Sequence, residues 1–245
     1  MAKKRVNILG VGIDPVTMTE AIRFCENRIS TRIPAEIITA NAEMVMQANA
    51  NPRLFAAMSN AALGIPDGAG VILAAKYFGM AMPERVAGYD LSQELLQLAA
   101  KKNFRVFFLG AAPGIAALAK SSAEIKYPGL KVVGVENGFF TVAEQDSVIA
   151  SIVKSKPDIL LAALGVPRQE LWLEEHLAKL AVPVCIGVGG TFDVMAGKVK
   201  RAPLWMQRGH IEWAYRLIMQ PWRIMRMMNL PKFALLVLLS KRDGK

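Results

Sequence analysis

The chain has 245 residues, of which 53% are hydrophobic and 20% are charged, a composition typical of a globular protein and not of a disordered one. Its formal net charge is +10. From Lys198 to the C-terminus, eleven basic residues stand against two acidic ones, so the basic character belongs to the tail. The N-terminus becomes polar too soon for a signal peptide, and no apolar run approaches the roughly 18 residues of a membrane span.

The sequence offers no pattern typical of a metal or cofactor site. Cys25 and Cys185 lie among apolar neighbours without metal-ligand spacing, and we interpret them as reduced core residues of a cytosolic protein. His176 and His210 have no partner at ligand spacing either. There is no D-x-D motif, and hence no obvious carboxylate pair for a metal–nucleotide complex. We therefore expect no metal and no cofactor.

Short apolar runs alternate with helical patterns along the chain. Thr17 and Glu20 predict a capping box that opens a helix ending near Ile29. Another helical pattern, over residues 44–58, is broken near Asn51–Pro52, and further helices follow the later strands. The predicted strands are Arg5–Val11, Ile37–Ala40, Ala61–Ile65, Arg105–Leu109, Leu130–Val135, Ile159–Leu164 and Val182–Val188. This alternation predicts a doubly wound α/β fold with a mainly parallel, Rossmann-like sheet over residues 1–203.

The segment from residue 204 to residue 245 has a different character, with Trp and Met residues interleaved with arginines. Arg216, Arg223 and Arg226 would share one face of a continuous helix, although Pro221 is expected to kink it. Phe233–Leu239 is apolar but too short to span a bilayer. A solvated face or an RNA-binding patch are alternatives, but the aromatic and apolar content favours a helical appendage that lies in a membrane interface.

Polar residues follow several of the predicted strands, at the edge where open parallel sheets bind ligands. Thr39 and Asn41 are either turn and cap residues or ligands. Asp67, in P-D-G-A-G, is either a carboxylate that a helix N-terminus stabilises or a general base. Arg85 suits a surface ion pair or a diphosphate.

The last two predicted strands are each followed by a glycine-containing, polar loop, and we expect these two loops to contribute to a binding site. Gly165 and Gln169 follow the first, and Gly189, Gly190 and Asp193 follow the second. The segment Gly187–Gly190 resembles a phosphate-binding turn but lacks the third glycine of the dinucleotide fingerprint, which disfavours a nicotinamide cofactor.

As an ordered set, the motifs of this chain resemble those of the WecG/TagA/CpsF glycosyltransferases, most closely the TagA type. The motifs are T-A-N-A-E at 39–43, P-D-G-A-G-V at 66–71, R-V-A-G-Y-D at 85–90, G-V-P-R-Q-E at 165–170, G-V-G-G-T-F-D at 187–193, R-A-P at 201–203 and E-W-A-Y-R at 212–216. Each motif is weak by itself, but their order and spacing cover nearly the whole chain. The resemblance implies transfer of N-acetylmannosamine from UDP-N-acetylmannosamine to undecaprenyl-diphosphate-linked N-acetylglucosamine, in the linkage unit of wall teichoic acid.

The resemblance also implies roles for individual residues. Asp67 matches the base, which takes the proton of the acceptor hydroxyl during attack with inversion. The donor sugar and diphosphate are matched by Thr39, Asn41, Arg85 and Gln169, and the nucleoside side by Gly189, Gly190 and Asp193. Arg216, Arg223 and Arg226 match an appendage that closes over the site at the membrane and meets the lipid diphosphate.

Two other functions remain open. One is a related transferase that uses the uronic acid of the same sugar, and the other is a non-catalytic nucleotide- or RNA-binding protein. For the main interpretation we expect a peripheral protein on the inner face of the cell membrane that binds no nucleic acid. The oligomeric state is open, because an amphipathic tail can also pack on a second copy when no membrane is present.

Overall fold

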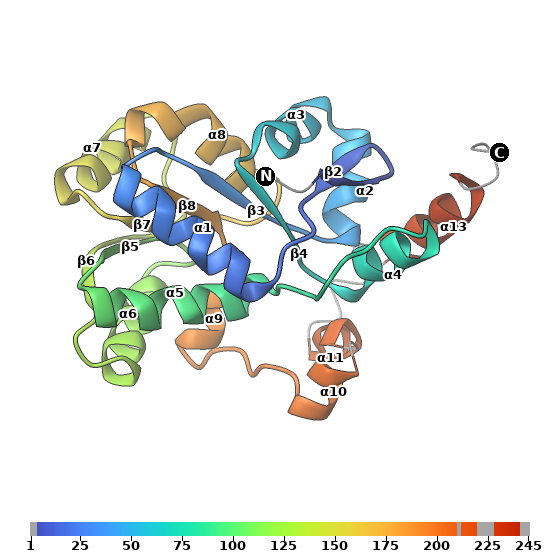
Figure 1. The fold of residues 1–245 in the computed structure, drawn as a ribbon. Coiled ribbons are helices and arrows are strands. Elements are labelled where there is room, and N and C mark those ends of the chain that lie inside the picture. Colours follow the sequence, from blue (N-terminus) through green and yellow to red (C-terminus); the bar gives the residue numbers. More distant parts are fainter. Residues whose placement is uncertain (1–3, 210–211, 220–227, 241–245) are drawn as a thin grey trace.

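The computed structural model describes residues 4–209, 212–219 and 228–240, and its centre is a six-stranded parallel sheet (Figure 1). The strand order is β4-β3-β8-β7-β5-β6. The strands are β3 (Glu36–Ala40), β4 (Leu63–Pro66), β5 (Arg105–Gly110), β6 (Lys131–Glu136), β7 (Ile159–Ala163) and β8 (Val184–Gly187). The central strands are buried along their whole length, which explains why they read as unbroken apolar runs.

Helices cover both faces of the sheet, and alternate residues of each strand point to opposite layers. Ile37 and Phe108 pack against one layer, whereas Ile38 and Phe107 pack on the other side. The first layer contains α1 (Met18–Thr31), α5 (Gly88–Lys102), α6 (Ile115–Lys126) and α9 (Thr191–Met195). The second contains α2 (Ala42–Ala50), α3 (Pro52–Asn60), α4 (Ala69–Tyr77), α7 (Gln145–Ser155) and α8 (Arg168–Leu180). The predicted doubly wound, Rossmann-like α/β fold is confirmed.

The prediction of one strand over Arg5–Val11 is wrong. The chain instead forms a hairpin of β1 (Val6–Ile8) and β2 (Val11–Ile13), which pair antiparallel in a separate two-stranded sheet. The chain reverses at Leu9 and Gly10, both at positive φ, and the side chain of Asn7 accepts a hydrogen bond from the Gly10 N–H at 2.8 Å. Apolar alternation is the same on both arms of a hairpin, so the pattern did not show the reversal.

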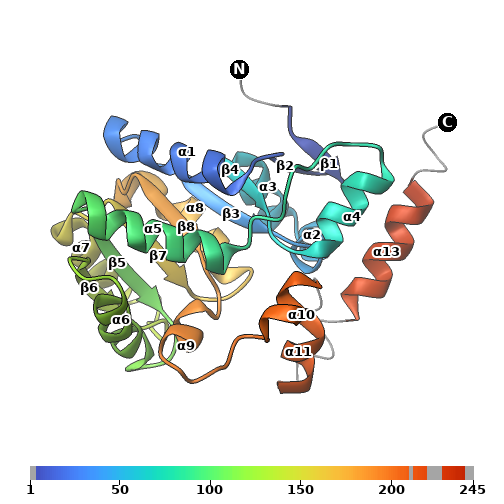
Figure 2. The same ribbon diagram turned by 60° about the horizontal axis from the view of Figure 1, so that its bottom comes forward.

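The C-terminal segment contains α10 (Leu204–Arg208), α11 (Glu212–Met219) and α13 (Asn229–Ser240). Helix α13 lies along α4 and contacts both α2 and α4 (Figure 2). Phe233 and Val237, one helical turn apart, are buried in the same apolar cluster as residues of these two helices. No helix in the described part of the chain is long and apolar enough to cross a membrane.

The loops after β3 and β8 leave the sheet in opposite directions, although these two strands are neighbours. The chain continues from β3 into α2, on one face, and from β8 into α9, on the other. Such a divergence opens a crevice at the carboxyl ends of the strands, where doubly wound folds bind their ligands. The topology therefore places the candidate site between these two loops.

Candidate active site

A small polar cavity of about 100 Å³ lies in this crevice. Its walls come from the ends of β3, β4 and β8, the start of α5 and the segment that leads to α10. The lining residues are Thr39, Asp67, Gly88, Tyr89, Val188, Gly190, Thr191, Asp193, Val194, Val199, Lys200, Arg201 and Ala202. Hydroxyl, carboxylate and cationic side chains thus line the same cavity.

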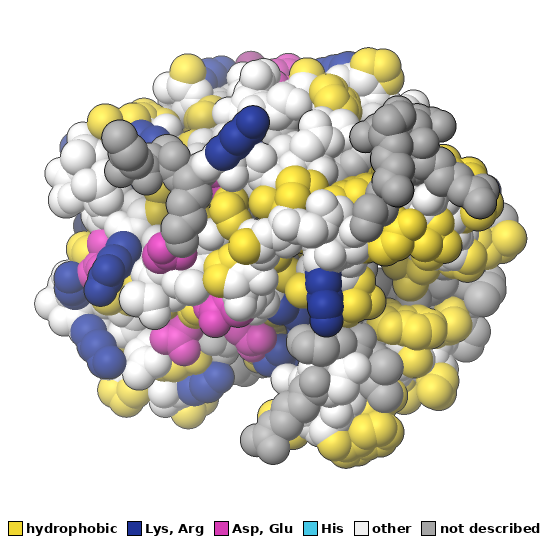
Figure 3. Space-filling model, turned by 45° about the vertical axis from the view of Figure 1, so that its right-hand side comes forward, with side chains coloured by type: hydrophobic (Ala, Val, Ile, Leu, Met, Phe, Trp, Pro, Cys, Tyr) yellow, Lys and Arg dark blue, Asp and Glu magenta, His cyan; other side chains and the backbone are white. Residues whose placement is uncertain are grey.

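A second, larger cavity of about 600 Å³ lies next to it, between α2, α4, α11 and α13. One end is polar and the other is apolar. The polar end is formed by Asn41, Glu43, Asp67, Arg85 and Glu212, and the apolar end by Leu73, Tyr77, Trp213, Leu230, Phe233, Val237 and Leu238. Large apolar side chains are also exposed around this end on α4, α11 and α13, and Figure 3 shows them gathered on that side of the molecule.

Asp67 stands at the junction of the two cavities. Of the described residues, only Asp67 lines both. Its backbone N–H donates to Ala40 O at 2.8 Å, which fixes the end of β4 against the end of β3. The next residue, Gly68, has a φ of +110° and lets the chain turn into α4 directly after the carboxylate. Sheet pairing and this turn together hold the partly buried Asp67 in position.

Thr39 and Asn41 follow β3 and face different cavities. The Thr39 hydroxyl donates to Gly187 O at 3.4 Å and lines the small cavity. The Asn41 side chain caps α2 by accepting from the Met44 N–H at 3.0 Å, and it also lines the large cavity. The cap predicted as an alternative for Asn41 is therefore present, and it leaves the residue in contact with the cavity.

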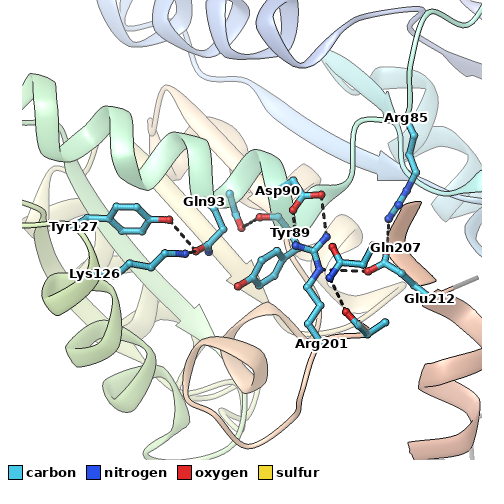
Figure 4. Close-up of polar contacts among 11 residues, drawn as sticks. Arg85, Tyr89, Asp90, Gln93, Lys126, Tyr127, Arg201, Gln207 and Glu212 are labelled. Atoms are coloured by element: carbon cyan, nitrogen blue, oxygen red, sulfur yellow. Dashed lines mark hydrogen bonds and ion pairs between the residues drawn. The ribbon is translucent and has the colours of Figure 1, made fainter. Parts of the chain in front are cut away.

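An ion-pair network joins α11 to the body of the protein. Glu212 accepts from both Arg85 and Arg201, the latter at 3.3 Å. Arg201 also donates to both carboxylate oxygens of Asp90, at 2.6 and 2.9 Å, and its guanidinium lies 4.5 Å from the centre of the Tyr89 ring (Figure 4). Burial alone would lower the pKa of Arg201, but its hydrogen bonds and charge interactions with Asp90 and Glu212 raise it above the usual value. The cationic side chain is thus held in the wall of the small cavity.

Of the predicted site residues in the loops after β7 and β8, two line the small cavity and two do not. Gly190 and Asp193 line the small cavity. Gln169 and Gly189 line neither cavity, and Gln169 is only 1% exposed. Its side-chain oxygen instead accepts from the N–H groups of Gly165 and Gly189. Gln169 therefore lies beneath the site and not in its wall.

The predicted arginines of the appendage are only partly within the described chain. Arg216 lies on α11, but its side chain is not described, and Arg223 and Arg226 fall outside the described residues. In the ranges that are described, no three His, Cys, Asp or Glu side chains form a group that could hold a metal ion.

Comparison with known proteins identifies the family. A model of the glycosyl transferase WecG/TagA/CpsF family matches residues 6–245. The chain belongs to this family. It is 37% identical to a relative from Bacillus subtilis (strain 168), in an alignment that covers 93% of this chain and 89% of the relative. It is 31% identical to a relative from Staphylococcus aureus (strain MW2), with 98% of this chain and 95% of the relative covered. Both are named N-acetylglucosaminyldiphosphoundecaprenol N-acetyl-beta-D-mannosaminyltransferase, as is a relative from Bacillus spizizenii that is 40% identical over 85% of this chain and 80% of its own length.

The structure adds residues to the site of this WecG/TagA/CpsF glycosyltransferase that the sequence did not single out. Tyr89, Asp90, Arg201 and Glu212 belong to motifs that carry the family resemblance, but spacing alone gave them no role. Lys200 lies outside those motifs and lines the small cavity. One signal in the sequence could have pointed to the four residues within the motifs. The motifs R-V-A-G-Y-D, R-A-P and E-W-A-Y-R each contain charged residues that no apolar pattern explains.

Proposed function

We propose that the chain is an inverting glycosyltransferase that moves N-acetyl-D-mannosamine from its UDP donor to undecaprenyl-diphosphate-linked N-acetylglucosamine, with Asp67 as general base. The names of the relatives support the sugar and the acceptor. The observation that carries the proposal is the position of Asp67 between a polar cavity and a larger, largely apolar one. A transferase that joins a nucleotide sugar to a lipid-linked sugar needs two such spaces, with its base where they meet.

The donor is assigned to the small cavity and the loops around it. Thr39 offers a hydroxyl to the sugar, and Asp193 offers a carboxylate to the ribose hydroxyls, as proposed from the family motifs. Lys200 and Arg201 line the same cavity and are suited to the diphosphate. The leaving UDP gains negative charge during the reaction, and these two cations would stabilise it.

The acceptor is assigned to the large cavity. The family motifs match Asn41 and Arg85 to the donor side, but both line this cavity and not the small one, so we propose that they face the acceptor near Asp67. The polar end suits the N-acetylglucosamine and the diphosphate of the acceptor, and the apolar end suits the first part of the polyprenyl chain. Apolar side chains exposed on α4, α11 and α13 would continue this surface into the membrane interface. Residues 204–245 would then act as a membrane-associating appendage and lid over a catalytic domain of residues 1–203, with Arg216, Arg223 and Arg226 near the lipid diphosphate and the protein on the inner face of the cell membrane.

The chemical step follows from this arrangement. The hydroxyl oxygen of the acceptor attacks the anomeric carbon of N-acetylmannosamine while the Asp67 carboxylate takes the hydroxyl proton. The bond between that carbon and the UDP oxygen breaks on the opposite face, and the electron pair leaves with UDP. One oxygen–carbon bond forms as another breaks, and because attack and departure take place on opposite faces, the configuration at the carbon inverts.

The test is release of UDP from UDP-N-acetylmannosamine in the presence of a soluble lipid-diphosphate N-acetylglucosamine analogue. The full chain should turn over, and Asp67→Asn should lower kcat by about a thousandfold, at the scale of a lost general base. Glu94→Gln, which removes an exposed carboxylate from α5, is the matched control and should retain full activity.

Other outcomes of this test would support a different substrate, base or function. Turnover only with the uronic acid form of the donor would reassign the substrate, and retained turnover by Asp67→Asn would remove the general base. Salt-sensitive RNA affinity without release of UDP from either donor would favour a non-catalytic binding protein.

A further inference from the structure

A buried pair of neighbouring residues on α8 connects the two loops beneath the small cavity. The Gln169 side-chain oxygen accepts from the Gly165 N–H at 3.1 Å and from the Gly189 N–H at 3.2 Å. Gly165 follows β7 and Gly189 follows β8, and both have positive φ values, of 81° and 50°. One amide oxygen therefore fixes the exits of two adjacent strands, and the second exit leads directly to Gly190, which lines the cavity.

This arrangement works only for one orientation of the Gln169 amide. If the amide were turned over, its NH₂ group would face two N–H donors, and all three groups would lose their acceptor. The Gln169 Nε2 group donates to the Glu170 carboxylate at 2.8 Å, which selects the orientation seen. Gly187 provides the space, since a Cβ atom there would lie 2.5 Å from Nε2.

Glu170 is also energetically unfavourable at this buried position. It is 1% exposed, and its second carboxyl oxygen has no hydrogen-bond partner within the described part of the chain. The nearby Glu36 carboxyl, on β3, likewise has a buried oxygen without a partner in the same residues. Burying a carboxyl group in this way destabilises the fold, and an apolar side chain would fill the space at lower cost. A role in the site would explain why a carboxylate is present.

We propose that Glu170 is a positioning residue for the donor: it orients Gln169, and Gln169 holds the loops of Gly165 and Gly189 in the shape that forms the small cavity. The inference rests on the proposed function in one respect, the assignment of the donor to that cavity. Glu170 lines neither cavity, so it acts through Gln169 and through the loop after β8.

The test compares substitutions at Glu170 that keep or remove the acceptor. Glu170→Met removes it with little change in volume, and we expect the KM for the UDP-sugar to rise about tenfold while the KM for the acceptor stays the same. Glu170→Gln can still present an oxygen to Gln169 and should stay within about threefold of the parent chain.

An exchange of the two residues tests the hydrogen bond itself. Gln169→Glu alone places two carboxylates side by side and should weaken donor binding about tenfold or more. The double variant Gln169→Glu/Glu170→Gln restores an amide–carboxylate pair, in which the new carboxylate accepts from both glycines, and should recover most of the donor affinity.

Thermal melting and direct binding of UDP by calorimetry accompany each variant. UDP binding reports on the loops even if the chain transfers a different sugar, so the result separates failure of this inference from failure of the proposed function. The inference is overturned by unchanged UDP affinity in Glu170→Met, by equal losses in Glu170→Met and Glu170→Gln, or by no recovery in a folded double variant.

Discussion

Arg85 and Glu212, 127 residues apart in the sequence, form an ion pair that joins the loop before α5 to helix α11. Both side chains line the large cavity, and both are largely buried. Because Glu212 also accepts from Arg201, one carboxylate connects an arginine that lines the large cavity to an arginine that lines the small cavity. A movement of α11 would therefore move Glu212 and displace both guanidinium groups.

The first prediction concerns this shared carboxylate. Glu212→Ala leaves two largely buried cations without their common partner, and hydrogen bonds to charged groups contribute about 1.5–3 kcal/mol each. We expect kcat/KM to fall at least tenfold, measured by UDP release with both substrates varied. Asp146→Ala, which breaks an exposed ion pair with Lys179 between α7 and α8, is the matched control and should have no effect, because neither residue lines either of the two cavities. Equal kcat/KM values for the two variants would contradict the proposed role.

The second prediction concerns the end of β5. Gly110 has a φ of +125°, and a Cβ atom there would lie 2.5 Å from the Ala163 backbone at the end of β7. Neither backbone can move without disturbing the parallel pairing, so Gly110→Ala should lower the free energy of unfolding by about 3 kcal/mol or more. Gly114→Ala is the control, because Gly114 has a φ of +81° but nothing within 4 Å of the added atom. Its cost should be about 1 kcal/mol, from backbone strain alone. Similar urea midpoints for the two variants would argue against a steric cause.

The third prediction follows from the buried Glu36 carboxyl, which is 2% exposed. Burial, together with the charges of Glu170 and Glu174, raises its pKa from 4.5 to about 9. Between these two values the folded chain holds a proton that the unfolded chain has lost, so this group makes the fold less stable as the pH rises. Glu36→Gln removes the titration and should stabilise the protein increasingly from pH 5 to pH 9, reaching about 2 kcal/mol.

Urea unfolding at pH 5, 7 and 9 measures this difference. Glu94→Gln, at an exposed position on α5, should give a difference that does not change with pH. A stability difference for Glu36→Gln that is the same at all three pH values would mean that Glu36 keeps an ordinary pKa in the folded state.

The sequence predicted the sheet well because its strands are buried on both faces and read as unbroken apolar runs. It predicted which loops meet for the same reason, since the carboxyl ends of parallel strands share one edge, and Thr39, Asp67 and Asp193 do line one cavity. The direction in which a loop side chain points cannot be predicted in this way, because no sequence pattern records it. Gln169 follows a strand as Asp67 does, yet it turns inward to the backbone of two glycines.

Two other features depend on tertiary contacts that no local pattern records. The apolar run Phe233–Leu239 is equally suited to a membrane surface and to the body of the protein, and in the structure Phe233 and Val237 are buried against α2 and α4 while Leu235, Leu236, Leu238 and Leu239 remain exposed. The ion pairs of Glu212 join segments that the sequence separates widely. Charge complementarity between Arg85, Arg201 and Glu212 is visible only after the fold has brought them together.

The last prediction concerns the contact between Gly88 and Thr39 in the wall of the small cavity. Gly88 is the first residue of α5, and a Cβ atom there would lie 2.6 Å from the Thr39 methyl group. Its φ is not in the left-handed region, so alanine suits the backbone and the main obstacle is this methyl group, with the Thr39 Cβ atom next at 3.2 Å. Gly88→Ala should therefore displace the Thr39 side chain and raise the KM for the UDP-sugar about tenfold, at the scale of an overpacked contact.

Thr39→Ser in the same chain removes the methyl group and keeps the hydroxyl that donates to Gly187 O. The double variant Gly88→Ala/Thr39→Ser should recover a KM within about threefold of that of Thr39→Ser alone, and the four chains form a double-mutant cycle whose coupling measures the contact. Gly79→Ala, at a position with nothing within 4 Å, controls for added volume and should leave the KM unchanged. If the KM rises equally with threonine and with serine at position 39, the alanine acts on the start of α5 and not through Thr39, and the donor sugar need not contact this wall.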